Sequence, residues 1–147
     1  MIIAAHFVSC GPCLTLRDTD TGRVYARYPL GENGEFSIAF VHSVNQTPVE
    51  DVFAAAGKEI RPIATVFRSF GAGMQTELEV GQVLHHHPDG SMSITGFDRR
   101  YPKLHYIVGT VSDHILTING ARLSLRALCG SNAAVTFQIE ERLQFDF

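Results

Sequence analysis

Short stretches of alternating polar and apolar residues, separated by turn-forming residues, run along almost the whole chain. The clearest example is the pair of runs at 115–118 and 122–125, which flank Asn119-Gly120. Asn-Gly between alternating runs is the strongest short-range hairpin signal, because both residues tolerate the positive φ that a tight turn requires. Pro88-Asp89-Gly90 marks another such turn. These signals predict a chain built from antiparallel hairpins.

A period of two residues is typical of half-buried strands. It predicts strands at residues 14–18, 23–28, 35–42, 49–55, 59–67, 82–86, 91–95, 104–111, 115–118, 122–125, 134–139 and 143–147. No window shows a 3.6-residue apolar stripe with caps, and a short helix starting at residues 48–54 is the weaker alternative. The fold class we expect is all-β, an antiparallel β-sandwich or a partly open β-barrel of about ten short strands.

Length and composition indicate one globular domain covering residues 1–147. Hydrophobic residues make up 45% and charged residues 18%, which is ordinary for a protein that buries a core. There is no repeat, low-complexity tract or linker. The net charge of −3 gives no basic surface for nucleic acid, so we expect no nucleic-acid partner.

The first ten residues, MIIAAHFVSC, are apolar, and no Lys or Arg precedes Arg17. A secretory signal requires a basic segment before its apolar core. Two interpretations stay open: a buried first strand, or the remainder of a signal or membrane anchor. No other stretch has the 18 or more apolar residues of a membrane-spanning helix.

Three cysteines are too few, and odd in number, for a disulfide framework. Cys10-Gly-Pro-Cys13 matches the CxxC redox pattern, which requires a helix N-terminus to activate the first thiol. A strand pattern follows instead, so we favour two small residues around a Gly-Pro turn. Loop closure and half of a metal site are the alternatives. Cys129 has no obvious partner.

The segment His42-Ser-Val-Asn-Gln-Thr-Pro-Val-Glu50 is the first candidate for chemistry. The predicted strand ends at His42, and Pro48 stiffens the connection and restricts Thr47 to extended conformations. Polar side chains are thus held on a stiff loop of a β scaffold, where binding groups commonly lie. The structural alternative is a corner in which these groups bond the backbone.

Three other segments carry candidate residues. Ser69-Phe-Gly-Ala-Gly73 allows close backbone approach or an anion-binding nest of amides, although an irregular loop is favoured. Asp113-His114 precedes a strand, and no Gly-x-Ser-x-Gly elbow surrounds Ser43 to complete a hydrolase triad. His85-His-His87 could place two imidazoles on one strand face, but an exposed run before a turn is favoured over a metal site.

Three segments together resemble a known family. They are His42-Ser-Val-Asn-Gln-Thr-Pro-Val-Glu50, Ser69-Phe-Gly-Ala-Gly-Met74 and Val108-Gly-Thr-Val-Ser-Asp-His114. In order and spacing the chain is similar to the bacterial and archaeal family called domain of unknown function 1850, over roughly residues 13–130. The first segment is the most specific. Asp51 stands where a second Glu is common, and the histidine run does not belong to the pattern.

The resemblance implies a small β-rich protein, periplasmic or otherwise extracytoplasmic, although the hydrophobic leader usual in exported members is missing here. It also implies association with tripartite (TRAP) transporters whose receptor is of the TAXI type, and hence with uptake of small organic anions. No activity follows from this association.

Two functions from different classes follow. The first is a non-enzymatic accessory or binding module, with TRAP transporter components or a small anionic ligand as partners. Its ligand-binding residues would be His42, Ser43, Thr47, Glu50, Ser69, Gly71, Gly73 and His114. The alternative is a small hydrolase or metal-binding protein that uses His42, Glu50 and His114. The favoured interpretation assigns no catalytic residue, metal ligand or cofactor and leaves the oligomeric state open.

Overall fold

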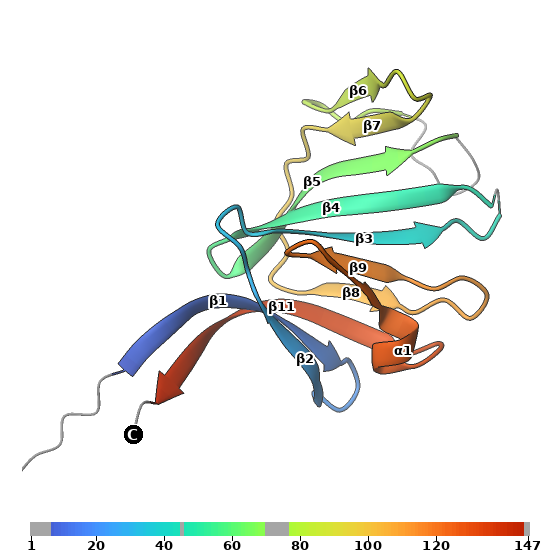
Figure 1. Ribbon diagram of the computed structural model, residues 1–147. Coiled ribbons are helices and arrows are strands. Elements are labelled where there is room, and N and C mark those ends of the chain that lie inside the picture. Colours follow the sequence, from blue (N-terminus) through green and yellow to red (C-terminus); the bar gives the residue numbers. More distant parts are fainter. Residues whose placement is uncertain (1–6, 45, 70–76, 146–147) are drawn as a thin grey trace, which may run out of the picture.

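The strands form two antiparallel sheets that pack face to face as a β-sandwich (Figure 1). The computed structural model describes residues 7–44, 46–69 and 77–145, with side chains between residues 11 and 141. The elements are β1 (Phe7–Asp18), β2 (Val24–Pro29), β3 (Glu35–Val41), β4 (Pro48–Ala56), β5 (Glu59–Phe67), β6 (Val83–His86), β7 (Met92–Thr95), β8 (Leu104–Ile107), β9 (Ile115–Ile118), β10 (Ala121–Ser124), α1 (Leu125–Cys129) and β11 (Ala134–Phe145).

The smaller sheet has the strand order β2-β1-β11-β8, and the larger sheet has the order β10-β9-β3-β4-β5-β7-β6. The all-β prediction is confirmed: in the described part of the chain no pairing joins the outer strands of either sheet, so neither closes into a barrel, and the two sheets are consistent with a β-sandwich. The same part of the chain holds no helix with the length and apolar character needed to cross a membrane.

The hairpins that were predicted from turn-forming residues are confirmed. Asn119 and Gly120 have φ of 51° and 76° and join β9 to β10. Gly57 and Gly90 also have positive φ, in the turns after β4 and β6. The weaker helix alternative at residues 48–54 is wrong, because this segment is β4 and pairs with both β3 and β5.

Three predicted boundaries are wrong. The strand expected at 104–111 ends at Ile107, because the chain turns back at the following residues. The strands expected at 134–139 and 143–147 form one strand over the described residues, β11, which runs to Phe145 and pairs along β1. The strand expected at 122–125 ends at Ser124, whose hydroxyl accepts a hydrogen bond from the Ala127 N–H and caps α1.

The Cys-Gly-Pro-Cys segment lies within β1. The register of β1 against β11 shifts between Ser9 and Pro12, and Gly11 takes a φ of 79° at this bulge. Cys13 is a buried free thiol. Because the segment continues as a strand, the helix N-terminus that activates a redox CxxC motif is not there.

The main core lies between the two sheets. Phe36 stacks on Phe53 and Phe137, with ring centroids 5.4 and 6.4 Å apart. Leu14 and Leu116 are fully buried in the same cluster. A second, smaller cluster lies further along the larger sheet on β4, β5 and β7, and consists of Val49, Phe67 and Ile94 with partly buried neighbours.

The strand directions bring several loops to one end of the sandwich. β3, β5 and β8 all point toward this end in Figure 1, so the β3–β4 loop and the β8–β9 loop lie there together. Antiparallel pairing of β6 with β7, and of β7 with β5, places the turn after β6 at the same end. All three segments of the family pattern thus start or finish at this end.

Candidate functional site

The loop between β3 and β4 is shaped by its own polar groups. The His42 N–H donates to the Thr47 carbonyl (2.9 Å), and the Gln46 N–H donates to the His42 carbonyl (2.9 Å). The Val44 N–H donates to His42 Nδ1 (3.3 Å), and Gln46 Nε2 donates to the Ser43 carbonyl (2.8 Å). The polar groups fix the loop, while the Val44 side chain is left 67% exposed.

Ser69 connects the second segment to this loop. Its Oγ donates to Thr47 Oγ1 over 3.5 Å, which places the end of β5 beside the start of β4. Gly71 and Gly73, predicted as an anion-binding nest, lie outside the described residues. That anion site therefore stays a prediction.

The β8–β9 loop reverses sharply at Gly109. A Cβ at this position would lie 2.1 Å from the Ser112 carbonyl oxygen, so only glycine fits. The Gly109 N–H donates to His114 Nδ1 (3.0 Å), and Ser112 Oγ donates to the Val41 carbonyl (3.2 Å). The last bond fastens this loop to the end of β3, directly before the β3–β4 loop, and the tip residue Val111 is 87% exposed.

Asp113 anchors the start of α1. Its carboxylate accepts hydrogen bonds from the Ser124 hydroxyl and from the Arg126 N–H (2.9 Å). Arg126 Nη2 in turn donates to the Gly109 carbonyl (3.0 Å). Burial alone would raise the pKa of Asp113, but these bonds hold that pKa below its ordinary value. The two hydrogen bonds from Ser124 and Arg126 give Asp113 a structural role at the start of α1.

The His114 imidazole is a half-buried part of the packing. It stacks on Phe40 (5.1 Å between centroids) and meets the edge of Tyr106 (5.8 Å). Burial is the main cause that lowers its pKa, which favours the neutral ring. Nδ1 accepts from the Gly109 N–H, so the neutral ring carries its proton on Nε2.

Glu50 and Asp51 point to opposite faces of the larger sheet, because adjacent strand residues alternate. Glu50 Oε1 accepts a hydrogen bond from Ser37 Oγ (2.6 Å) over a shallow outer groove that Thr117 also lines. Asp51 lies on the inner face and forms part of a different cavity. Glu50 therefore does not share a site with His114, which packs on the inner side against Tyr106.

The cavity above Asp51 lies at the margin of the main core and has a volume of about 230 Å³. Asp51 Oδ1 accepts from Thr65 Oγ1, and Oδ2 accepts from the Tyr106 hydroxyl, both at 2.8 Å. Its walls include side chains from β5, from the segments before β6 and before β8, and from the start of β8. They include Thr65, Glu79, Gln82, Phe97, Arg99, Tyr101 and Leu104.

Burial dominates the electrostatics at this carboxylate. It raises the pKa of Asp51, against the opposing effect of the bonds from Tyr106 and Thr65. Burial, followed by the charge of Asp51, raises the pKa of the Tyr106 phenol. Tyr106 therefore stays protonated and acts as a donor.

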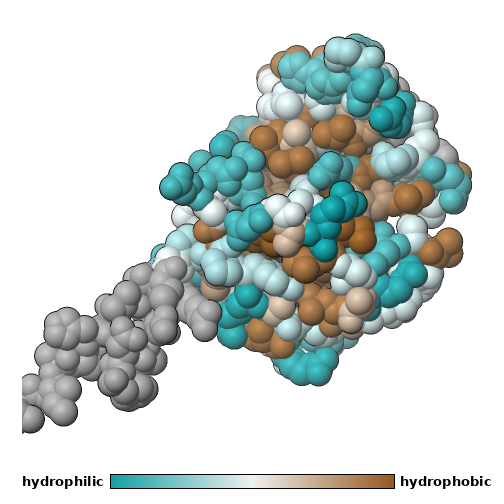
Figure 2. Space-filling model, viewed as in Figure 1, coloured by the Kyte–Doolittle hydropathy of each residue, from teal (hydrophilic) through white to brown (hydrophobic). Residues whose placement is uncertain are grey.

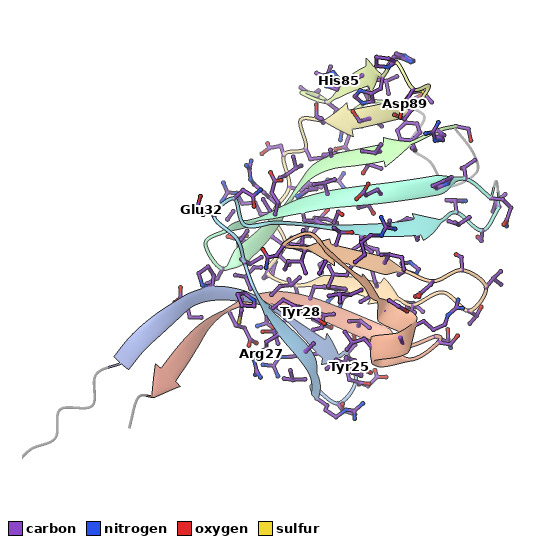
Figure 3. All side chains as sticks on the ribbon, in the orientation of Figure 1. Tyr25, Arg27, Tyr28, Glu32, His85 and Asp89 are labelled. Atoms are coloured by element: carbon purple, nitrogen blue, oxygen red, sulfur yellow. The ribbon has the colours of Figure 1, made fainter. Side chains whose placement is uncertain are left out.

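The histidines of the His85-His-His87 run and Cys129 are not among the residues that line this cavity. His85 and His87 bond the hydroxyls of Thr95 (2.9 Å) and Ser93 (2.8 Å) at the edge of the larger sheet formed by β6 and β7, where Figure 3 labels His85. Cys129 is a free thiol, and burial raises its pKa to about 11. Among the described residues no three His, Cys, Asp or Glu side chains are grouped as metal ligands would be.

The structure thus brings together part of the predicted site. His42, Ser43, Thr47 and Ser69 lie at one end of the sandwich, and His114 lies beneath them against Phe40. The sequence reasoning missed Thr65 and Tyr106 as partners of Asp51. The available signal was strand alternation, which assigns the neighbours Glu50 and Asp51 to different faces.

The described parts of the three segments lie at one end of the sandwich. Neither the curated proteins nor the solved structures include a significant match to this chain. The family model described as "Domain of unknown function (DUF1850)" matches residues 36–125, which contain all three segments. The chain therefore belongs to the DUF1850 family of domains of unknown function.

Proposed function

We propose that this protein is a non-enzymatic accessory module that binds a protein partner with the end of the sandwich where the β3–β4 and β8–β9 loops meet. We call this area the loop-end surface and define it as residues 42–44, 46–47 and 108–114. The observation that carries the proposal is the exposure of Val44 and Val111 at one end of the sandwich, where a hydrogen bond fastens the β8–β9 loop to the end of β3.

The polar groups of these loops support binding over catalysis. His42 Nδ1 and His114 Nδ1 each accept a backbone N–H, and Asp113 anchors α1. Glu50 is bonded to Ser37 on the other face of the sheet. A general acid–base or metal site requires such groups to converge on one reacting atom, and this arrangement gives the enzyme alternative no such point.

The apolar tips supply what a protein contact needs. Figure 2 shows hydrophobic surface reaching the margin of the molecule at this end. Because hydrogen bonds hold both loops, a partner would order few additional groups on binding. Burying an exposed valine contributes about 1.5 kcal/mol at the low end of the usual range, so Val44 and Val111 together would contribute about 3 kcal/mol.

The proposed partner is a component of a TAXI-type TRAP transporter. This choice rests on the resemblance of the family to proteins encoded beside such transporters. The proposed role is accessory, in the uptake of small organic anions, with the transporter component as the macromolecule that contacts Val44 and Val111.

The test is calorimetric titration of the purified protein with the purified TAXI receptor and, separately, with the membrane subunits in detergent. We expect Val44→Asp combined with Val111→Asp to weaken binding by at least about 100-fold, since about 1.4 kcal/mol corresponds to tenfold. Val80→Asp is the matched control. Val80 is fully exposed and precedes β6, so it lies at the end of that strand that is remote from the loop-end surface.

Circular dichroism melting of all variants would establish that they are folded. Equal binding by the double variant and the control would refute the loop-end surface. Absence of binding to every transporter component at micromolar concentration would refute the proposed partner.

A further inference from the structure

The cavity above Asp51 lies apart from the loop-end surface, and it has the features of a small-molecule site. Its volume of about 230 Å³ lies below the roughly 300–1,000 Å³ of pockets for drug-sized ligands, which suits a compact ligand. Its walls combine aromatic rings with convergent polar groups, a combination typical of ligand pockets.

The charges at this cavity do not cancel. Asp51 makes no ion pair with Lys or Arg among the described residues. Arg99, the cation of the cavity, is already in an ion pair with Glu79. The lining therefore carries an excess negative charge, which is centred on a partly buried carboxylate.

Asp51 also keeps capacity for a further donor. Its two oxygens accept one hydrogen bond each, from Thr65 and Tyr106. An ionised carboxylate offers about four acceptor positions. A cationic donor would use the remaining positions and offset the cost of holding the charge away from water.

The aromatic walls favour the same kind of ligand. Phe97 and Tyr101 line the cavity together with Asp51. The faces of such rings attract ammonium groups electrostatically. An anion would meet the Asp51 carboxylate and find Arg99 occupied by Glu79.

We propose that the cavity above Asp51 binds a small organic monocation, a primary or methylated ammonium compound, with its charged group on the Asp51 carboxylate. This inference is independent of the proposed partner protein, because the cavity and the loop-end surface share no residue.

The experiment is an NMR titration of the ¹⁵N-labelled full chain with benzylammonium chloride. Benzyl alcohol and sodium benzoate serve as neutral and anionic probes of matched shape at equal ionic strength. We expect saturable shifts of the Asp51, Thr65 and Phe97 amides in the millimolar range with benzylammonium. The alcohol and benzoate should bind at least about tenfold more weakly, as expected for a charge-assisted bond.

Two variants test the assignment. Asp51→Asn should reduce benzylammonium affinity at least about tenfold, since it removes the charge. Asp20→Asn, the same change in an exposed turn between β1 and β2, should leave it unaltered. Phe97→Leu keeps an apolar side chain and should lower the affinity about threefold, as loss of a cation–π contact predicts.

Saturable binding of benzoate in preference to benzylammonium would overturn the proposal. So would benzylammonium shifts confined to residues outside this cavity, or equal affinity of the Asp51→Asn and Asp20→Asn proteins. If Asp51→Asn does not fold, the Phe97→Leu protein provides the test. If this variant prefers benzylammonium over benzyl alcohol by the same factor as the wild type, the proposal is overturned.

Discussion

The β8–β9 loop yields the sharpest prediction, because its tight reversal depends on one missing Cβ. We consider Gly109→Ala, which adds a methyl group 2.1 Å from the Ser112 carbonyl oxygen. Favourable carbon contacts lie at about 3.5 Å or more, so the carbonyl must move by more than about 1 Å. The contact is with backbone, and no side-chain rotamer relieves it.

The magnitude follows from what that movement disrupts. Overpacking of this kind costs about 1–3 kcal/mol. The shift also weakens the bonds from Gly109 N–H to His114 Nδ1 and from Ser112 Oγ to the Val41 carbonyl, worth about 1 kcal/mol each. We therefore expect Gly109→Ala to lower the free energy of unfolding by about 3–5 kcal/mol.

Urea unfolding followed by circular dichroism measures this change, and thermal melting gives a second readout. For a chain of this size about 1 kcal/mol lowers Tm by about 2–4 °C, so a decrease of at least about 6 °C is expected. Thr110→Ala, at the exposed next position of the same turn, is the control and should change the free energy by less than about 0.5 kcal/mol. A loss below about 1 kcal/mol for Gly109→Ala would refute the steric argument.

Three further outcomes concern buried or anchoring polar groups. The pKa of Asp51 is raised in the folded protein, so protonation of Asp51 stabilises the fold. This contribution to the free energy of unfolding is fully present below the unfolded pKa and is lost as pH rises through the folded pKa. Asp51→Asn should remove this decrease from a plot of unfolding free energy against pH. Tyr106→Phe removes one donor to that carboxylate and should raise the pKa of Asp51 further, as ¹³C NMR titration of the carboxyl would show. The pKa of Asp113 is lowered in the folded protein, so the ionised carboxylate stabilises the fold and this contribution is lost as pH falls through the folded pKa. Asp113→Ala should therefore lower the free energy of unfolding by about 2 kcal/mol at neutral pH, and its difference from wild type should shrink at low pH. Urea unfolding measures both, with Asp20→Ala as the control.

The strand content and most hairpins could be predicted from sequence because both are local. Alternation with a period of two defines a strand, and Asn119-Gly120 defines its turn through backbone conformations that few residues tolerate. The order of strands in the two sheets is not local. It depends on which apolar faces pack together, as when β9 pairs with β3 across a long separation in sequence.

The α1 helix shows why some elements are missed. It has five residues and no full apolar stripe, and its N-terminus is held by Asp113 from across the β9–β10 hairpin. The preceding alternation favoured a continued strand, whereas the Ser124 hydroxyl caps the helix in the structure. A tertiary contact thus decided a short segment whose local pattern allowed two structures.

The candidate site was predicted in part for a similar reason. The family segments identified residues that meet in space, since Ser69 bonds Thr47 and Ser112 bonds the end of β3. The segments did not show that most of these polar groups bond the backbone. They also gave no sign that Tyr106 would supply a donor to Asp51, because that contact joins two different sheets.

The pairing of Phe7 with Phe145 means that the two ends of the described chain leave the sandwich side by side. In Figure 1 this two-stranded ribbon extends away from the end that carries the β3–β4 and β8–β9 loops. A fluorophore or immobilisation tag attached at residue 7 or residue 145 would therefore leave those loops accessible. The same pairing allows circular permutation, in which a short Gly-Ser linker joins the termini and a new start is opened at Gly57-Lys58, in an exposed turn.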